Sequence, residues 1–147
     1  MPGLEEELSR GYASARLITQ KDLTEEHRRL FRKDHGERCP GMVKVDFFGD
    51  RRPTWALALF QNSSSAAKVQ LLVARRLADG WKLTSLDSTD AAVPPVVWTE
   101  GPGEYRDVLE ERKIRAKHPV IIFAGYESWA IVYAWTGTEV ARVWITD

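Results

Sequence analysis

Residues 120–147 read VIIFAGYESWAIVYAWTGTEVARVWITD. This stretch holds three apolar runs, Val120–Ala124, Trp129–Trp135 and Val140–Ile145, with short glycine-containing segments between them. Runs of this length that are rich in β-branched and aromatic residues and bounded by turn residues are typical of antiparallel strands. The C-terminal part of the chain therefore predicts three consecutive strands joined by tight turns.

An alternating pattern with a period of two residues extends back from these runs to residue 42. The apolar positions that share a strand face are Val43, Val45 and Phe47, then Trp55, Leu57 and Leu59, then Val69, Leu71 and Val73. Asp79-Gly80 then predicts a tight hairpin, with Trp81–Thr84 as the returning strand. Residues 41–147 as a whole predict a meandering antiparallel sheet of about six to eight strands.

Two segments interrupt this pattern. Pro94-Pro95 cannot lie inside a central ladder, so we expect only a short edge strand at Val96–Trp98. The segment Gly103–Lys117 has apolar and basic residues at helical spacing and predicts a short helix. The residues with that spacing are Tyr105, Val108, Leu109 and Arg112.

Residues 1–40 predict a helical N-terminal segment. A helix starts after Asp22 or Thr24 as its N-cap, opens with acidic residues and carries basic residues toward its end, as the helix dipole favours. Gly36 and Pro40 end it. The expected fold is thus a single α+β domain over residues 1–147, in which the helical segment packs on the sheet of residues 41–147.

The composition excludes several classes of function. The chain has 21 basic and 21 acidic residues, so it lacks the concentrated positive charge that nucleic acids attract. No apolar run approaches the roughly 20 residues needed to cross a bilayer, so membrane insertion is not expected. Cys39 is the single cysteine, which excludes an intrachain disulfide and a zinc site with several thiolates. We expect no cofactor.

The segment Asp46–Ala56 reads DFFGDRRPTWA and joins two of the expected strands. Asp46 and Asp50 offer carboxylate oxygens from a tight turn, which is the geometry that a hard cation such as calcium needs. This segment resembles the calcium loop of FG-GAP/VCBS-type repeats, which follows the pattern D-F-[ND]-G-D-G-x-x-D before an apolar strand. The resemblance implies a loop that bridges two strands around an ion.

This loop departs from the family pattern at three positions, where it carries Phe48, Arg51 and Thr54. Two side-chain carboxylates fall short of the 6–8 oxygen ligands that calcium takes. We expect Arg51 or Arg52 to neutralise the carboxylates directly, and we expect no bound metal. A calcium-stabilised structural module remains an alternative.

Residues 39–147 also resemble a family of small uncharacterised bacterial proteins, which are often exported. The likeness rests on the Cys39-Pro40-Gly41 start, the single loop, the hairpin Tyr126–Trp135 and the terminal Trp144–Asp147. It implies export and brings no established activity. The N-terminal MPGLEEELSR has acids where a signal peptide has basic and then apolar residues, so an exported and a cytoplasmic location both remain open.

The histidines supply the enzymatic alternative. His35 and Cys39 fit no standard metal-ligand spacing. His118 is a candidate general base for a small hydrolase or metal-dependent enzyme, provided that a carboxylate lies within hydrogen-bond reach. The candidate carboxylates are those of Glu127, Asp46 and Asp50.

Six tryptophans distinguish the chain, and most of them are in phase with apolar strand neighbours, which favours a place in the core. We expect Trp81 and Trp98 to be the more exposed ones, because they lie near turn and proline segments. The leading hypothesis is a non-enzymatic binding domain for a protein or a glycan, in the manner of an inhibitor or immunity protein. Its expected binding residues are Arg51, Arg52, Trp98 and Tyr105.

Overall fold

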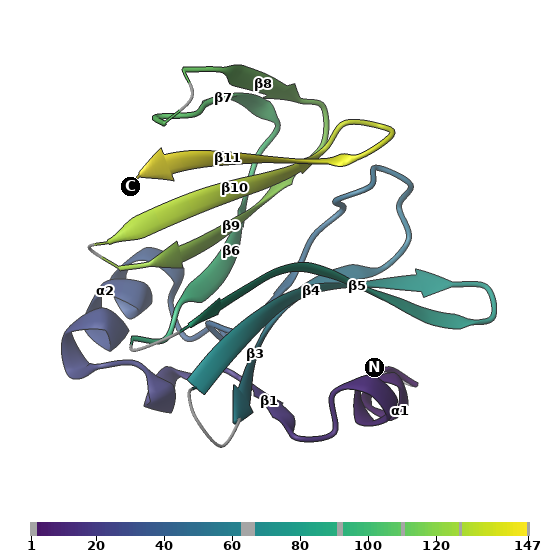
Figure 1. Ribbon diagram of the computed structural model, residues 1–147, viewed down its shortest axis with the longest axis vertical. Coiled ribbons are helices and arrows are strands. Elements are labelled where there is room, and N and C mark those ends of the chain that lie inside the picture. Colours follow the sequence, from purple (N-terminus) through teal and green to yellow (C-terminus); the bar gives the residue numbers. More distant parts are fainter. Residues whose placement is uncertain (1–2, 63–66, 91–92, 110, 127, 147) are drawn as a thin grey trace.

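The computed structural model of the protein describes residues 3–62, 67–90, 93–109, 111–126 and 128–146. Two antiparallel sheets face one another, and a two-stranded hairpin lies on the outer side of one of them (Figure 1). Helix α1 lies on the outer side of the other sheet, and α2 lies near the start of β6 (Figure 1). The architecture is α+β with mostly β structure.

The first sheet is built around three long consecutive strands, β3 (Thr54–Asn62), β4 (Ala67–Leu77) and β5 (Gly80–Asp90). Leu77 pairs with Gly80, so the predicted hairpin is present, but its turn residues are Ala78 and Asp79 and Gly80 already belongs to the returning strand. Two short strands, β1 (Ala15–Leu17) and β2 (Met42–Lys44), pair with different halves of β3. Strand β5 therefore forms the far edge of this sheet.

The second sheet contains the three C-terminal strands and β6 (Val96–Glu100), in the order β11-β10-β9-β6. The C-terminal strands are β9 (Val120–Gly125), β10 (Trp129–Trp135) and β11 (Val140–Thr146), which confirms the prediction from residues 120–147. Strand β6 lies at one edge, as the two prolines before it required. Strand β11 lies at the other edge.

The main core lies between the two sheets. Its side chains come from alternate positions of the facing strands, including Leu71 and Val73 of β4 and Ile121 and Phe123 of β9. The intervening positions of β9 and β10, such as Ile122 and Val132, are equally buried but belong to a second cluster on the outer face. Both faces of this sheet are therefore covered, which explains why β9 is apolar along its whole length.

The second cluster is covered by the hairpin of β7 (Gly103–Arg106) and β8 (Lys113–Ala116). The predicted helix at Gly103–Lys117 is therefore wrong. Tyr105 pairs with Ile114 across the hairpin, and both side chains pack on the outer face of the second sheet. A partner surface of this kind overrides a local helical spacing, because burial of the alternating side chains favours an extended chain.

The strand count and the topology also differ from the expectation. The described part of the chain has eleven strands in three sheets rather than six to eight strands in one meander. The alternation of apolar residues did not predict β7 and β8. It also did not predict β1, which lies within a segment expected to be helical. A three-residue strand leaves too little alternation to be recognised, and β1 depends on its pairing with β3.

The helices of the N-terminal segment are α1 (Leu4–Gly11) and α2 (Glu25–His35), with a 3-10 turn at Gln20–Asp22. The Thr24 hydroxyl caps α2 by accepting a hydrogen bond from the His27 N–H at 3.2 Å, as predicted for this N-cap. Phe31 and Leu23 pack against Val96 at the start of β6. In the described residues, neither helix has the length and apolar character required to span a bilayer.

Candidate functional site

Trp129 begins β10 directly after the turn from β9, where the Ser128 N–H donates to the Gly125 carbonyl at 3.1 Å. Its indole lies over Gly125 so closely that a Cβ on Gly125 would be 2.7 Å from the indole nitrogen. The ring meets Phe123 edge-on at 5.2 Å between centroids and Trp144 at 6.3 Å. The absence of a side chain at Gly125 therefore leaves the space that the Trp129 indole occupies.

Three adjoining hollows of about 270, 240 and 190 Å³ are all lined by Trp129. We call them together the Trp129 groove. The first two hollows lie beside β5 of the first sheet, and the third lies between Trp98 of β6 and the turn from β9 to β10. Four aromatic side chains, Trp98, Tyr126, Trp129 and Trp144, line the groove.

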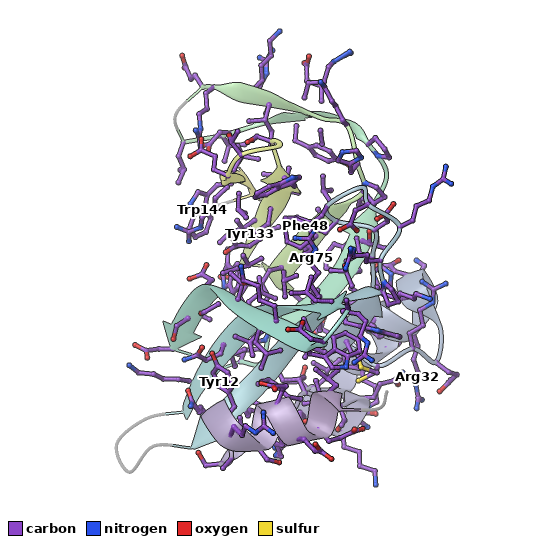
Figure 2. All side chains as sticks on the ribbon, turned by 90° about the vertical axis from the view of Figure 1, so that its right-hand side faces the viewer. Tyr12, Arg32, Phe48, Arg75, Tyr133 and Trp144 are labelled. Atoms are coloured by element: carbon purple, nitrogen blue, oxygen red, sulfur yellow. The ribbon has the colours of Figure 1, made fainter. Side chains whose placement is uncertain are left out.

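Polar side chains converge in the hollow between Trp129 and Trp144. They are Asp87, Ser88 and Thr89 of β5 and Arg142 of β11. The Arg142 guanidinium lies over the Trp144 ring, 5.2 Å from its centroid, and its Nη2 donates to Asp87 Oδ2 at 3.1 Å. Figure 2 shows Trp144 with Tyr133, which lies deeper in the same sheet.

Asp87 is held by groups from both sheets. Its Oδ2 atom also accepts a hydrogen bond from the Tyr133 hydroxyl, and its Oδ1 atom accepts one from the Ser88 N–H at 2.8 Å. Burial, together with the hydrogen bond to Asp87, raises the pKa of Tyr133, so the phenol stays protonated and remains a donor. The hollow therefore has a fixed polar wall beside its two indoles.

Tyr126 forms the other end of the groove, where it meets α2. Its hydroxyl and the His27 Nδ1 atom are buried and have no hydrogen-bond partner among the described residues, and the two rings lie 5.4 Å apart. Burial, with a smaller effect of Asp34, raises the pKa of Tyr126 to about 12. Beyond this end, a larger hollow of about 990 Å³ runs along α2 and is lined mainly by charged side chains of that helix.

The loop between β2 and β3 has a different chemistry from the one expected. Asp46 accepts a hydrogen bond from the Arg51 N–H at 3.1 Å, and Asp50 accepts one from the Arg52 N–H at 3.0 Å. The main cation on Asp50 is Arg75 of β4, whose Nε donates at 3.1 Å, whereas the Arg52 Nε is 3.9 Å away. Arg52 therefore contributes to neutralising Asp50, as expected, but Arg75, which was not expected, is the closer cation.

The electrostatics of the loop follow from these contacts. Partial burial raises the pKa of Asp50, but the hydrogen bonds from Arg75 and Arg52 outweigh it, so the pKa lies below its ordinary value. Arg75 also lies over the Phe48 ring, 4.4 Å from its centroid, and Figure 2 shows the two side chains beside each other. Within the described ranges, no group of three or more histidine, cysteine or acidic residues is placed to hold a metal ion.

His118 lies against this loop. A Cβ on Gly49 would be only 2.2 Å from the His118 ring, so the imidazole occupies the space that Gly49 leaves open. In the part of the chain that the structure describes, no hydrogen bond or ion pair joins His118 to Asp46 or Asp50. Glu127, the third expected carboxylate, lies outside the described residues. The enzymatic alternative remains a prediction.

The expected binding residues lie in three places. Arg51 and Arg52 line a separate hollow on the β2–β3 loop. Trp98 lines one end of the Trp129 groove, and its Nε1 donates a hydrogen bond to the Glu100 carboxylate at 3.0 Å. The Tyr105 hydroxyl donates to the Gly101 carbonyl at 2.6 Å and lies with the outer hairpin. Trp81 and Trp98 are both partly buried rather than exposed.

Sequence reasoning therefore missed most of the groove. Its polar wall comes from Asp87 and Arg142, which are 55 residues apart and meet only because two sheet edges face each other. The one available signal was the set of tryptophans in β10 and β11. Comparison with protein-family models, with curated proteins and with solved structures found no match to this chain.

Proposed function

We propose that the protein is a non-enzymatic binding domain that takes a glycan in the Trp129 groove. One observation carries the proposal: Trp129 and Trp144 line the same hollow as Asp87, Ser88, Thr89 and Arg142. A sugar ring presents an apolar C–H face and a rim of hydroxyl groups. Aromatic rings accept the apolar face, whereas hydroxyl, carboxylate and guanidinium groups bond to the rim.

The polar wall supports binding rather than proton transfer. Asp87 accepts hydrogen bonds from Tyr133, Arg142 and the Ser88 N–H, so its carboxylate is already held in one orientation. A general acid or base instead needs to exchange its own proton with the substrate. A held carboxylate beside two hydroxyl side chains is suited to orienting ligand hydroxyls.

The edge of β5 favours a glycan over an added peptide strand. Strand addition needs a regular row of unpaired backbone N–H and C=O groups. At the groove the Ser88 N–H already donates to the Asp87 side chain, and the pairing of β4 with β5 shifts register between Leu71 and Leu72. Both features make the edge of β5 irregular where it lines the hollow.

The experiment is a screen of the intact chain on an array of oligosaccharides, followed by calorimetric titration of the hits. Trp144→Ala is the test variant and Trp81→Ala is its matched control, because each tryptophan is partly buried in an edge strand beneath an arginine. We expect Trp144→Ala to weaken binding by about thirtyfold, the usual effect of removing an aromatic hot spot, and Trp81→Ala to leave it unchanged.

Two results would contradict the proposal. One is an array on which the folded protein retains no glycan. The other is an equal loss of affinity in both variants, which would place the binding outside the groove. Retention of glycan by wild type and Trp81→Ala but not by Trp144→Ala supports it.

A further inference from the structure

The β2–β3 loop carries a second hollow, of about 340 Å³, that is separate from the Trp129 groove. Three residues with cationic side chains line it, namely Lys44, Arg51 and Arg52. One carboxylate, that of Asp46, lines it as well. The hollow therefore has an excess of positive charge in a chain whose net charge is zero.

Only one of the three cations has an ion pair within the described part of the loop, because the Arg52 Nε lies 3.9 Å from Asp50. Asp46 is satisfied by the backbone N–H of Arg51, and Asp50 is paired with Arg75 of β4. Among the described residues, neither the Lys44 ammonium nor the Arg51 guanidinium has an ion-pair partner. Two cations beside one hollow thus retain their capacity to bind an anion.

The backbone at Arg51 is held in a conformation that disfavours an arginine. Its φ is +62°, in the left-handed region where glycine is the residue of lowest energy. The Asp46 side chain holds it there through the Arg51 N–H. The loop therefore keeps a strained residue in place, and that residue is exposed and lines the hollow.

We infer that this hollow binds a tetrahedral oxyanion, a phosphoryl group above all. The forked guanidinium of Arg51 matches two phosphate oxygens, and the Lys44 ammonium adds a point charge. Two chemical forms supply this group, the free ion and a phosphomonoester of a small molecule such as a sugar. Both present the same oxygens to Lys44 and Arg51. This site stands independently of the glycan proposal, because it shares no lining residue with the groove.

The test is a titration of the intact, isotope-labelled chain with inorganic phosphate at constant ionic strength, followed by amide NMR shifts of Arg51 and Arg52. We expect saturable shifts, and we expect Arg51→Gln and Lys44→Gln each to weaken binding by about tenfold, as for a lost charged hydrogen bond. Arg106→Gln is the matched control, because it removes the same charge from an exposed position on β7 outside the hollow. It should leave the affinity unchanged.

Arg51→Gly separates binding from folding. Glycine suits the left-handed backbone, so this variant should melt at a higher temperature and yet lose phosphate affinity. A parallel titration with glucose 6-phosphate and with glucose identifies the source. Tighter binding of the ester than of inorganic phosphate points to a phosphorylated ligand, and equal affinities point to the free ion.

Three results would overturn the inference. The first is a set of shifts that rises linearly with phosphate and never saturates. The second is an equal loss of affinity in Arg106→Gln, which would show a general effect of charge. The third is full phosphate affinity in Arg51→Gly.

Discussion

The Tyr133 hydroxyl on β10 donates a hydrogen bond to the Asp87 carboxylate on β5, and this contact links the two sheets at one side of the buried interface. Tyr133 is 1% exposed, so its phenol is among the most deeply buried polar groups of the second sheet. The same carboxylate orients Arg142 over Trp144. The stability of the sandwich and the geometry of the Trp129 groove therefore depend on one shared group.

Tyr133→Phe should lower the free energy of unfolding by about 1–2 kcal/mol, because the ring stays packed while the buried bond to a carboxylate is lost. Urea denaturation of this variant, of Asp87→Asn and of the double variant forms a thermodynamic cycle. The cycle should show a coupling of about 1 kcal/mol between the two residues. Strictly additive losses would contradict a direct bond between them.

Gly49→Ala should destabilise the protein by about 2–4 kcal/mol, since it combines an unfavourable backbone with a steric clash. The φ of Gly49 is +69°, and the new methyl group would lie 2.2 Å from the His118 ring. Thermal or urea unfolding measures the loss. Adding His118→Ala should recover the part caused by the clash but not the part caused by the backbone. If His118→Ala recovers nothing, the imidazole does not occupy the position described.

The ion pair of Arg16 with Asp22 should make stability depend on acid pH. Two hydrogen bonds from Arg16, at 2.7 and 2.8 Å, and one from the Thr19 N–H lower the pKa of Asp22 to about 2, against the opposing effect of burial. A lowered pKa in the folded state means that the stabilisation is complete above about pH 4 and is lost as the pH falls toward 2.

Because Arg16 is largely exposed, solvent screening reduces the contribution to about 1 kcal/mol. Urea unfolding of wild type and Asp22→Asn at pH 6 and pH 2.5 measures it. The variant should be less stable than wild type at pH 6, and the difference should shrink at pH 2.5. An equal difference at both pH values would show that the Asp22 carboxylate titrates normally in the folded protein.

Excess calcium and then EDTA should leave the midpoint of thermal unfolding unchanged. Asp46 and Asp50 already accept hydrogen bonds from the loop backbone, and Asp50 is paired with Arg75. An ion that bound only the folded state at 100 times its dissociation constant would add about 2.7 kcal/mol. A clear rise in the midpoint with calcium would show that the loop holds an ion in spite of Phe48 and Arg51.

The period of the apolar residues determined the parts of the fold that lie in long strands. Three features follow from residues that are close together in the chain: the strands β9, β10 and β11, the hairpin between β4 and β5, and the cap of α2. Such features depend on local geometry, because side chains alternate along a strand and a turn needs particular residues at particular positions. The sequence alone was sufficient for the strands and the hairpin, and it left Asp22 and Thr24 as alternatives for the cap.

Only the tertiary structure decided what covers each sheet and where the groove lies. The segment with Tyr105 and Ile114 forms a hairpin because these two side chains are buried against the apolar outer face of the second sheet. Asp87 met Tyr133 and Arg142 because two sheets pack face to face, and Arg75 reached Asp50 across 25 residues. Contacts between distant segments depend on how whole sheets pack, and the pattern of apolar residues within one segment does not predict that packing.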